Sequence, residues 1–212
     1  MIRNTAVTVC GPLNVNKLGV TYVHEHLMVK PQLPDEYYIP YTLDDEAAST
    51  EETRSFSAAG GETLVEMTPI NYGRNVKAYQ RIAQATGVHV ICCTGFHKQL
   101  FMPPWFGDKT DGELYDILMD EVTNGLDGTQ IHPGVIRLGT SLEEVTAAEK
   151  RSIEAVARVH RDTGIPISTH CDKGTMGMDQ LRLLEKHGVD PKNVLLCHID
   201  SKMDTDYAIR LC

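Results

Sequence analysis

Residues 134–171 carry the sequence GVIRLGTSLEEVTAAEKRSIEAVARVHRDTGIPISTHC. A short apolar run at 134–140 is followed by a helical pattern at 147–163, a glycine at 164 and a second apolar run at 166–171. Short apolar runs bounded by Gly, Pro, Asn or Asp indicate strands, and a glycine just after a helical pattern marks the end of a helix. The stretch therefore predicts a strand, a helix and a second, parallel strand.

The same alternation extends in both directions along the chain. Further strands are predicted at residues 20–28, 62–69, 89–96 and 193–199, and further helices at 43–59, 75–86, 111–126 and 178–187. Most of the strand runs are apolar throughout, as is typical of parallel strands that are buried on both faces. The chain thus predicts six successive βα units, preceded by a hairpin within residues 5–17.

Two architectures accommodate six βα units: an open, doubly wound sheet and a (β/α)8 barrel. The open fold usually has a G-x-G-x-x-G turn after its first strand, and this sequence has none. The first strand instead ends in charged and imidazole side chains, which suits a barrel, because barrel chemistry lies at the carboxyl ends of the strands. We expect an α/β fold of the (β/α)8 TIM-barrel family, incomplete here with about six units, in one domain over residues 1–212.

The composition excludes several classes of protein. The chain has 212 residues and a formal charge of −9, without the basic patch of a nucleic-acid binder. No run approaches the ~18 apolar residues that span a bilayer, and residues 1–5 have no apolar segment of a secretory signal. Six cysteines form no C-x-x-C pair. We expect a cytoplasmic protein with no nucleic-acid and no membrane partner.

Four histidines fall at the predicted carboxyl ends of strands. His24 and His26 are two residues apart on the first strand and therefore share a face, where both can chelate one cation. His170 ends the fifth strand and His198 the sixth. Hydrogen-bonded structural histidines are the alternative at each position. Because imidazole is a good ligand for zinc and several transition metals, we expect a divalent metal ion, zinc first.

Three further residues follow strands three and five. His97 follows the third strand, and we expect it either to line a substrate site or to be structural. Lys98 and Lys173 can each meet an anionic group of a substrate, with ordinary loop lysines as the alternative.

The sequence resembles the phosphotriesterase-related metal-dependent hydrolases of the amidohydrolase superfamily. The matching segments are GVTYVHEHL at 19–27, GGETLVE at 60–66, GRN at 73–75, TGF at 94–96, GVIRLGTS at 134–141, STH at 168–170, GV at 188–189 and CHID at 197–200. The segment HCDKGTM at 170–176 is closest to the branch that acts on lactones, including phosphorylated sugar lactones.

The resemblance implies a barrel with two divalent metals and metal-assisted hydrolysis. It implies that His24 and His26 bind the buried metal and that His170 and His198 bind the more exposed one. A metal in such a site lowers the pKa of bound water and polarises the bond that is broken.

Two positions depart from the family pattern. Arg137 stands where the family has a bridging carboxylated lysine or glutamate, and an arginine cannot form a carbamate because it stays protonated. A guanidinium ~4 Å from a divalent ion costs about 8 kcal/mol at an effective dielectric of ~20. The family's aspartate after strand eight has no counterpart before Cys212. Asp172 and Asp200 can partly substitute for it, Asp172 as the catalytic candidate, with supporting or loop positions as the alternative for both. We therefore expect one metal ion or none.

Three functions remain open at this point. The first is a metal-dependent hydrolase acting on a small-molecule lactone or phosphoester, with an anionic substrate favoured. The second is a catalytically impaired homologue that keeps the fold and at most one metal. The third is a non-enzymatic binding or self-associating module. Because a sheet that does not close exposes two strand edges, we also expect a homo-oligomer.

Overall fold

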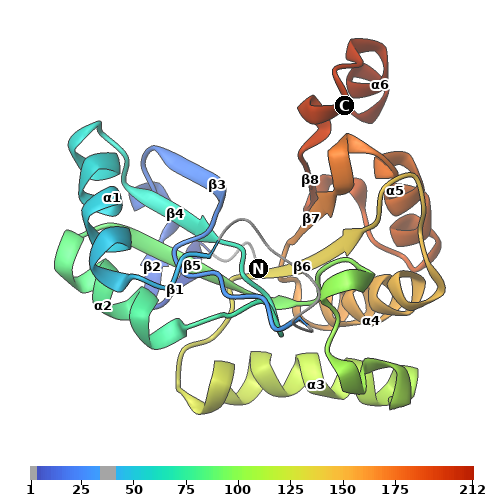
Figure 1. The fold of residues 1–212 in the computed structure, drawn as a ribbon, viewed down its shortest axis with the longest axis horizontal. Coiled ribbons are helices and arrows are strands. Elements are labelled where there is room, and N and C mark those ends of the chain that lie inside the picture. The colour runs from blue at the N-terminus through green and yellow to red at the C-terminus, as the bar shows by residue number, and fades with distance from the viewer. Residues whose placement is uncertain (1–3, 34–41) are drawn as a thin grey trace. The chain divides into compact units, whose positions relative to one another are not determined.

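The computed structural model describes residues 4–33 and 42–212 (Figure 1). Contacts divide the chain into two compact units, which are described separately below. The first unit comprises Met1–Thr94 and Asp120–Gly134, and the second comprises Gly95–Met119 and Val135–Cys212. The single-domain interpretation stays a prediction. Residues 1–3, on which the expectation about a secretory signal partly rests, lie outside the described residues.

The first unit contains the predicted hairpin, three parallel strands and two helices. Its strands are β1 (Thr5–Thr8), β2 (Gly11–Asn14), β3 (Thr21–Glu25), β4 (Thr63–Glu66) and β5 (His89–Gly95), whose last residue belongs to the second unit. Its helices are α1 (Glu46–Ala58) and α2 (Val76–Thr86), which pack against each other. Strands β1 and β2 pair antiparallel, whereas β3 with β4 and β4 with β5 pair parallel.

Local capping sets the helix boundaries in the first unit. Helix α1 begins after Asp45, whose carboxylate accepts hydrogen bonds from the N–H groups of Ala47 and Ala48. It therefore starts three residues later than the predicted 43, because an N-cap residue stands outside the helix. Helix α2 ends at Gly87, which has a φ of +75°, a conformation that glycine adopts without strain.

The second unit contains the last three βα units. Its strands are β6 (Val135–Thr140), β7 (Ile167–Cys171) and β8 (Val194–Cys197), and both of their pairings are parallel. Its helices are α4 (Ala147–Thr163), α5 (Gly177–Lys186) and α6 (Thr205–Leu211). Helix α3 (Asp111–Asn124) spans the division between the units. Helix α4 packs on β6 and on α5, over a core that includes Ile136, Leu138, Ile153, Val156 and Ile167.

The order of the parallel strands is β3-β4-β5-β6-β7-β8, which is the order of the chain. This succession confirms the predicted βα units, and the predicted strands are one to four residues too long. Short 3-10 turns connect the elements, at Val15–Lys17, Gln99–Phe101, Pro104–Asp108, Leu126–Gly128, Asp172–Gly174, Pro191–Asn193 and Ile199–Lys202.

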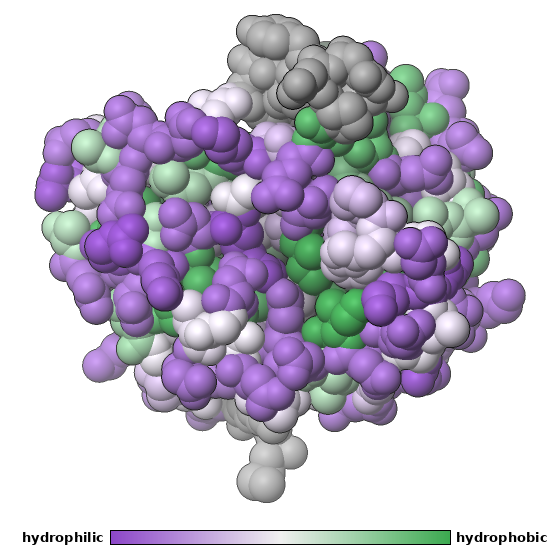
Figure 2. Space-filling view, turned by 60° about the horizontal axis from the view of Figure 1, so that its bottom comes forward, coloured by the Kyte–Doolittle hydropathy of each residue, from purple (hydrophilic) through white to green (hydrophobic). Residues whose placement is uncertain are grey.

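The surface of the molecule agrees with its composition. Hydrophilic residues predominate on the face drawn in Figure 2. Within residues 4–33 and 42–212, no helix combines the length and the apolar character needed to cross a membrane.

Candidate functional site

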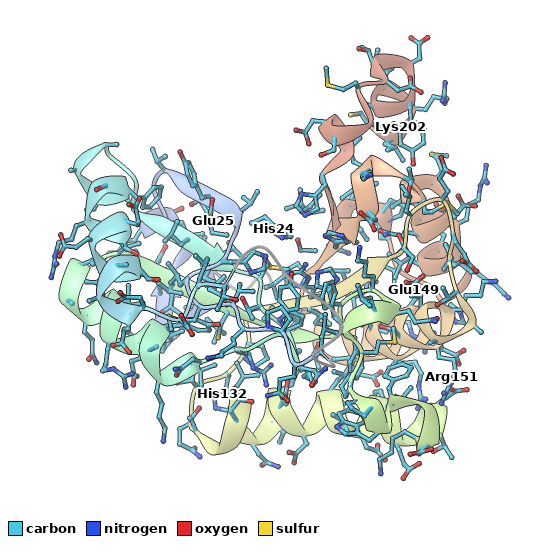
Figure 3. All side chains as sticks on the ribbon, in the orientation of Figure 1. His24, Glu25, His132, Glu149, Arg151 and Lys202 are labelled. Atoms are coloured by element: carbon cyan, nitrogen blue, oxygen red, sulfur yellow. The ribbon has the colours of Figure 1, made fainter. Side chains whose placement is uncertain are left out.

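The end of β3 carries the first pair of histidines. The His24 and His26 rings lie with their centroids 5.4 Å apart in an edge-to-face arrangement, and both side chains are half-buried. Figure 3 labels His24 and its neighbour Glu25, at the end of this strand. The i, i+2 spacing thus brings two imidazoles together within the first unit, as predicted.

A buried carboxylate, which the sequence analysis did not select, lies behind His26. Glu66 ends β4 and is 0% exposed. Its Oε1 accepts a hydrogen bond from the Thr68 hydroxyl (2.6 Å) and from the Leu27 N–H (3.2 Å), and its Oε2 accepts from the Thr68 N–H (3.2 Å). The Thr68 Oγ1 also lies 2.8 Å from Nδ1 of His26. Glu66 and Thr68 therefore organise the chain immediately after the first histidine pair.

The charge of Glu66 acts on two other buried groups. Burial, together with the carboxylate of Glu66, raises the pKa of the Tyr79 hydroxyl well above its usual value. The same two causes raise the pKa of the Cys92 thiol to about 12. Both groups therefore stay neutral beside Glu66 at physiological pH.

In the second unit, three histidines lie in a row. The ring centroids of His97 and His170 are 4.5 Å apart, and those of His170 and His198 are 4.8 Å apart. His97 follows β5, His170 lies in β7 and His198 follows β8. Three strand ends thus contribute adjacent imidazoles, which is the arrangement predicted for His170 and His198, with His97 added to it.

Arg137 lies on β6 beside this row. Its side chain is buried, at 1% exposure, and its Nη2 lies 3.1 Å from Nε2 of His97. The main-chain oxygen of Arg137 accepts a hydrogen bond from the Phe96 N–H (3.1 Å). A Cβ atom on Gly95, where φ is +113°, would lie 2.0 Å from that same oxygen. Glycine at position 95 is therefore required for the segment after β5 to lie this close to Arg137.

Asp172 and Lys98 form an ion pair in the second unit. The Nζ of Lys98 donates to Oδ2 of Asp172 at 2.5 Å, and both side chains are largely buried. Lys98 also lies over the ring of Phe101, 5.8 Å from its centroid. Lys173, in the turn after β7, is exposed. The structure thus gives Asp172 a defined partner, and the catalytic role expected for it stays a prediction.

Glu149 connects two loops at the same end of the strands. This buried residue lies in the first turn of α4 (Figure 3). Its Oε1 accepts hydrogen bonds from the Ser141 hydroxyl (2.6 Å) and the Gln99 N–H (3.0 Å), and its Oε2 accepts from the Thr146 N–H (2.9 Å). The loops that follow β5 and β6 are thereby fixed to one carboxylate.

Strained backbone concentrates in the loops after β6, β7 and β8. Non-glycine residues with positive φ in these loops are Glu143, Lys173, Met176, His198 and Met203, at +47° to +67°. Such conformations cost about 1–3 kcal/mol each and tend to cluster at functional sites. Of the histidine row, His198 itself has this conformation, in the loop after β8.

A cavity of about 500 Å³ opens in the first unit. It lies between the end of β3 and α1, and its walls include His26, Leu27, Leu64 and the ring pair Tyr22–Phe56, whose centroids are 4.7 Å apart. Acidic residues also line it: Glu25, Asp44, Asp45 and Glu52. The sequence carries no signal of this cavity, because its lining comes from segments far apart in the chain.

The histidine pairs described above suit a metal ion, whereas Arg137 does not. Each pair, His24 with His26 and His170 with His198, offers adjacent imidazole nitrogens, which are good zinc ligands. Arg137 does not fit a metal ion, because a buried cation beside His97 repels a divalent ion. In the described part of the chain, no group of three or more His, Cys, Asp and Glu side chains is arranged to hold a metal ion.

Comparisons with known proteins identify the family. The model of the Phosphotriesterase family matches residues 4–212. A phosphotriesterase homology protein from Escherichia coli is 33% identical over 200 residues, which are 94% of this chain and 68% of that protein. The chain belongs to the phosphotriesterase family.

Two further relatives are lactonases. A phospho-furanose lactonase from Mycoplasmopsis synoviae is 30% identical, over 98% of this chain and 63% of that protein. The solved structure of a lactonase from Listeria monocytogenes matches with a TM-score of 0.92 at 29% identity, over 98% of this chain and 69% of that one. The chain spans about two thirds of the length of these relatives. Together with the six βα units in residues 4–33 and 42–212, this likeness confirms the predicted fold of the (β/α)8 TIM-barrel family.

Proposed function

We propose that this chain is a hydrolase of lactone or phosphoester bonds that acts on a small substrate with an anionic group. The observation that carries the proposal is the row of His97, His170 and His198, with Arg137 beside it, at the carboxyl ends of the strands. This is the end at which barrel enzymes place their chemistry. The lactonases among the relatives support the reaction type. The use of cysteines without a disulfide spacing supports a cytoplasmic location.

The proposal includes a divalent metal ion, with zinc as the first choice. His24 and His26 would hold it in the first unit, or His170 and His198 in the second. When bound, such an ion lowers the pKa of a coordinated water and polarises the oxygen of the bond to be cleaved.

The remaining site residues bind and orient the substrate. Lys98 and Lys173 attract its anionic group, and Asp172 holds the Nζ of Lys98 in place. His97 is fixed between Arg137 and the ring of Phe101, whose centroid lies 4.7 Å away. The cation of Arg137 stabilises negative charge that develops near His97.

A substrate panel tests this proposal. The purified chain is assayed with neutral lactones, phosphorylated sugar lactones and a chromogenic phosphotriester, each with and without added zinc. We expect turnover of lactones, highest for the phosphorylated ones, and weak or no turnover of the triester. Triester turnover well above lactone turnover would show that the proposed substrate class is wrong.

Arg137 favours a second candidate function, a catalytically impaired homologue that keeps the fold and at most one metal. A buried guanidinium at the bridging position keeps a second metal away. If this candidate holds, Arg137→Lys raises both zinc uptake and lactone turnover, because a lysine can lose its proton and form a carbamate. If wild type already turns over lactones and Arg137→Lys lowers the rate, the impaired reading is wrong.

A further inference from the structure

The environment of His26 contains a chain of hydrogen bonds that has not yet been given a function. It runs from Nδ1 of His26 to the hydroxyl of Thr68 (2.8 Å) and from that hydroxyl to Oε1 of Glu66 (2.6 Å). Thr68 and Glu66 are both 0% exposed. This series of hydrogen bonds therefore connects the half-buried imidazole of His26 to the fully buried carboxylate of Glu66.

The chemistry of these groups fixes the direction of the hydrogen bonds. Both oxygens of Glu66 accept main-chain N–H groups, from Leu27 and Thr68, so that Glu66 acts here as an acceptor. The Thr68 hydroxyl has one proton, and the main-chain oxygen of Met28, 3.1 Å away, is a further acceptor for it beside Glu66. Since that proton goes to an oxygen acceptor, Thr68 Oγ1 accepts a hydrogen bond from Nδ1 of His26. The proton of the neutral imidazole therefore lies on Nδ1.

We propose that Glu66 and Thr68 are positioning residues that hold His26 in the tautomer protonated at Nδ1 and so direct the lone pair of Nε2 to a metal ion. The inference rests on the function proposed above. A metal-binding histidine usually donates its other ring N–H to an oxygen, which fixes the ring and raises its basicity. Here the oxygen is a hydroxyl that is itself oriented by a carboxylate.

The position of Glu66 supports a role beyond packing. A buried carboxylate is costly unless its oxygens are hydrogen-bonded, and three of its bonds involve Leu27 and Thr68. Leu27 directly follows His26, and the register of the sheet pairs Glu66 with Glu25. The carboxylate thus holds the main chain after His26 as well as the partner of its ring.

The first experiment measures the tautomer of His26 in the metal-free chain from the ¹⁵N chemical shifts of its two ring nitrogens. We expect the Nδ1-protonated form in wild type and a shift toward the Nε2-protonated form, which free imidazole side chains prefer, in Thr68→Val. Thr68→Ser keeps the hydroxyl and should restore the wild-type shifts. Thr63→Val is the matched control, because Thr63 is a fully buried threonine on β4 whose hydroxyl donates to Leu18 instead.

The second experiment measures zinc affinity by competition with a chelator. We expect Thr68→Val and Glu66→Gln to weaken zinc binding by about 10- to 100-fold, while Thr63→Val and Thr68→Ser leave it unchanged. Retained dispersion of the amide spectra identifies the variants that are folded.

The two readouts separate the possible failures. Wild-type His26 protonated at Nε2, or Thr68→Val with wild-type ring shifts, overturns the inference. A tautomer shift in Thr68→Val without weaker zinc binding overturns the positioning role toward a metal. A wild-type chain that binds no zinc overturns the metal in the proposed function, and the ring shifts still decide whether Glu66 and Thr68 fix His26.

Discussion

Burial sets the reactivity of the cysteine side chains. Cys92, Cys171 and Cys197 are buried, whereas Cys10 and Cys212 are exposed. Burial raises the pKa of the Cys171 thiol to about 12 and also raises that of Cys197, while burial and Glu66 raise that of Cys92 to about 12. At pH 8 roughly one in ten thousand of the Cys92 and Cys171 side chains is therefore the reactive thiolate.

Alkylation of the native protein checks this expectation. At pH 8 we expect iodoacetamide to label Cys10 and Cys212 first, as followed by peptide mass mapping. Because the raised pKa keeps the buried thiols protonated, their labelling should speed up as the pH rises toward 10. In guanidinium chloride all six cysteines should react at similar rates. Equal labelling rates of Cys171 and Cys212 in the native protein at pH 8 would contradict the burial of Cys171.

The candidate site was predictable where a local pattern carries it. His24 and His26 come together because strand residues two apart share a face, and His170 and His198 because both end neighbouring strands. Glu66 and Thr68 were not predictable, because their role comes from contacts across about 40 residues of sequence. Glu149 had a local signal, since Thr146 and Glu149 have the spacing of a capping box.

At the scale of elements, the start of α4 depends on Glu149. Thr146 and Glu149 form a reciprocal capping box, and the same carboxylate accepts hydrogen bonds from Gln99 and Ser141. Thr146→Ala removes one cap and should lower the free energy of unfolding by about 1 kcal/mol. Glu149→Ala leaves three donors without their acceptor and should lower it by about 3 kcal/mol.

Urea denaturation measures both losses. Glu154→Ala, a glutamate to alanine change on the same helix at a half-buried position, is the matched control and should change stability by much less. A Glu149→Ala variant as stable as Glu154→Ala would contradict the assigned role of the carboxylate.

The elements themselves were largely predictable, because an apolar run marks each strand and a glycine follows each of the helices α1 to α5. The strand ends were less so. The prediction extended the first strand to residue 28, whereas β3 ends at Glu25. Beyond that point the N–H of Leu27 bonds the side chain of Glu66 rather than a neighbouring strand. Because the side chain of Glu66 takes the place of the main chain of a neighbouring strand, the sequence carries no periodic signal that marks this strand end.

At the scale of the whole molecule, β3 stands at one end of the strand order and exposes apolar side chains. Within β3, Tyr22 is 54% exposed and Val23 49%, and Val20, directly before the strand, is 58% exposed. An edge strand with exposed apolar residues favours association with a second copy. We therefore expect a dimer or larger species in sedimentation velocity, and Val20→Lys with Val23→Lys should shift it toward monomer.

Leu100→Lys provides the control for this test. Leu100 is 41% exposed and lies in the 3-10 turn after β5, away from the β3 strand in sequence. The Leu100→Lys substitution should leave the association unchanged. Wild type sedimenting as a monomer at every concentration would show that the exposed edge does not drive assembly.

We propose that Arg137 occupies the position of the family's bridging ligand, so that the chain holds at most one divalent ion. Its guanidinium is buried, and its Nη2 lies 3.1 Å from Nε2 of His97. The most direct test is elemental analysis of the purified chain, with its intact mass verified, after incubation with excess zinc and desalting. We expect one zinc ion or fewer per chain. Two zinc ions per chain would contradict this proposal.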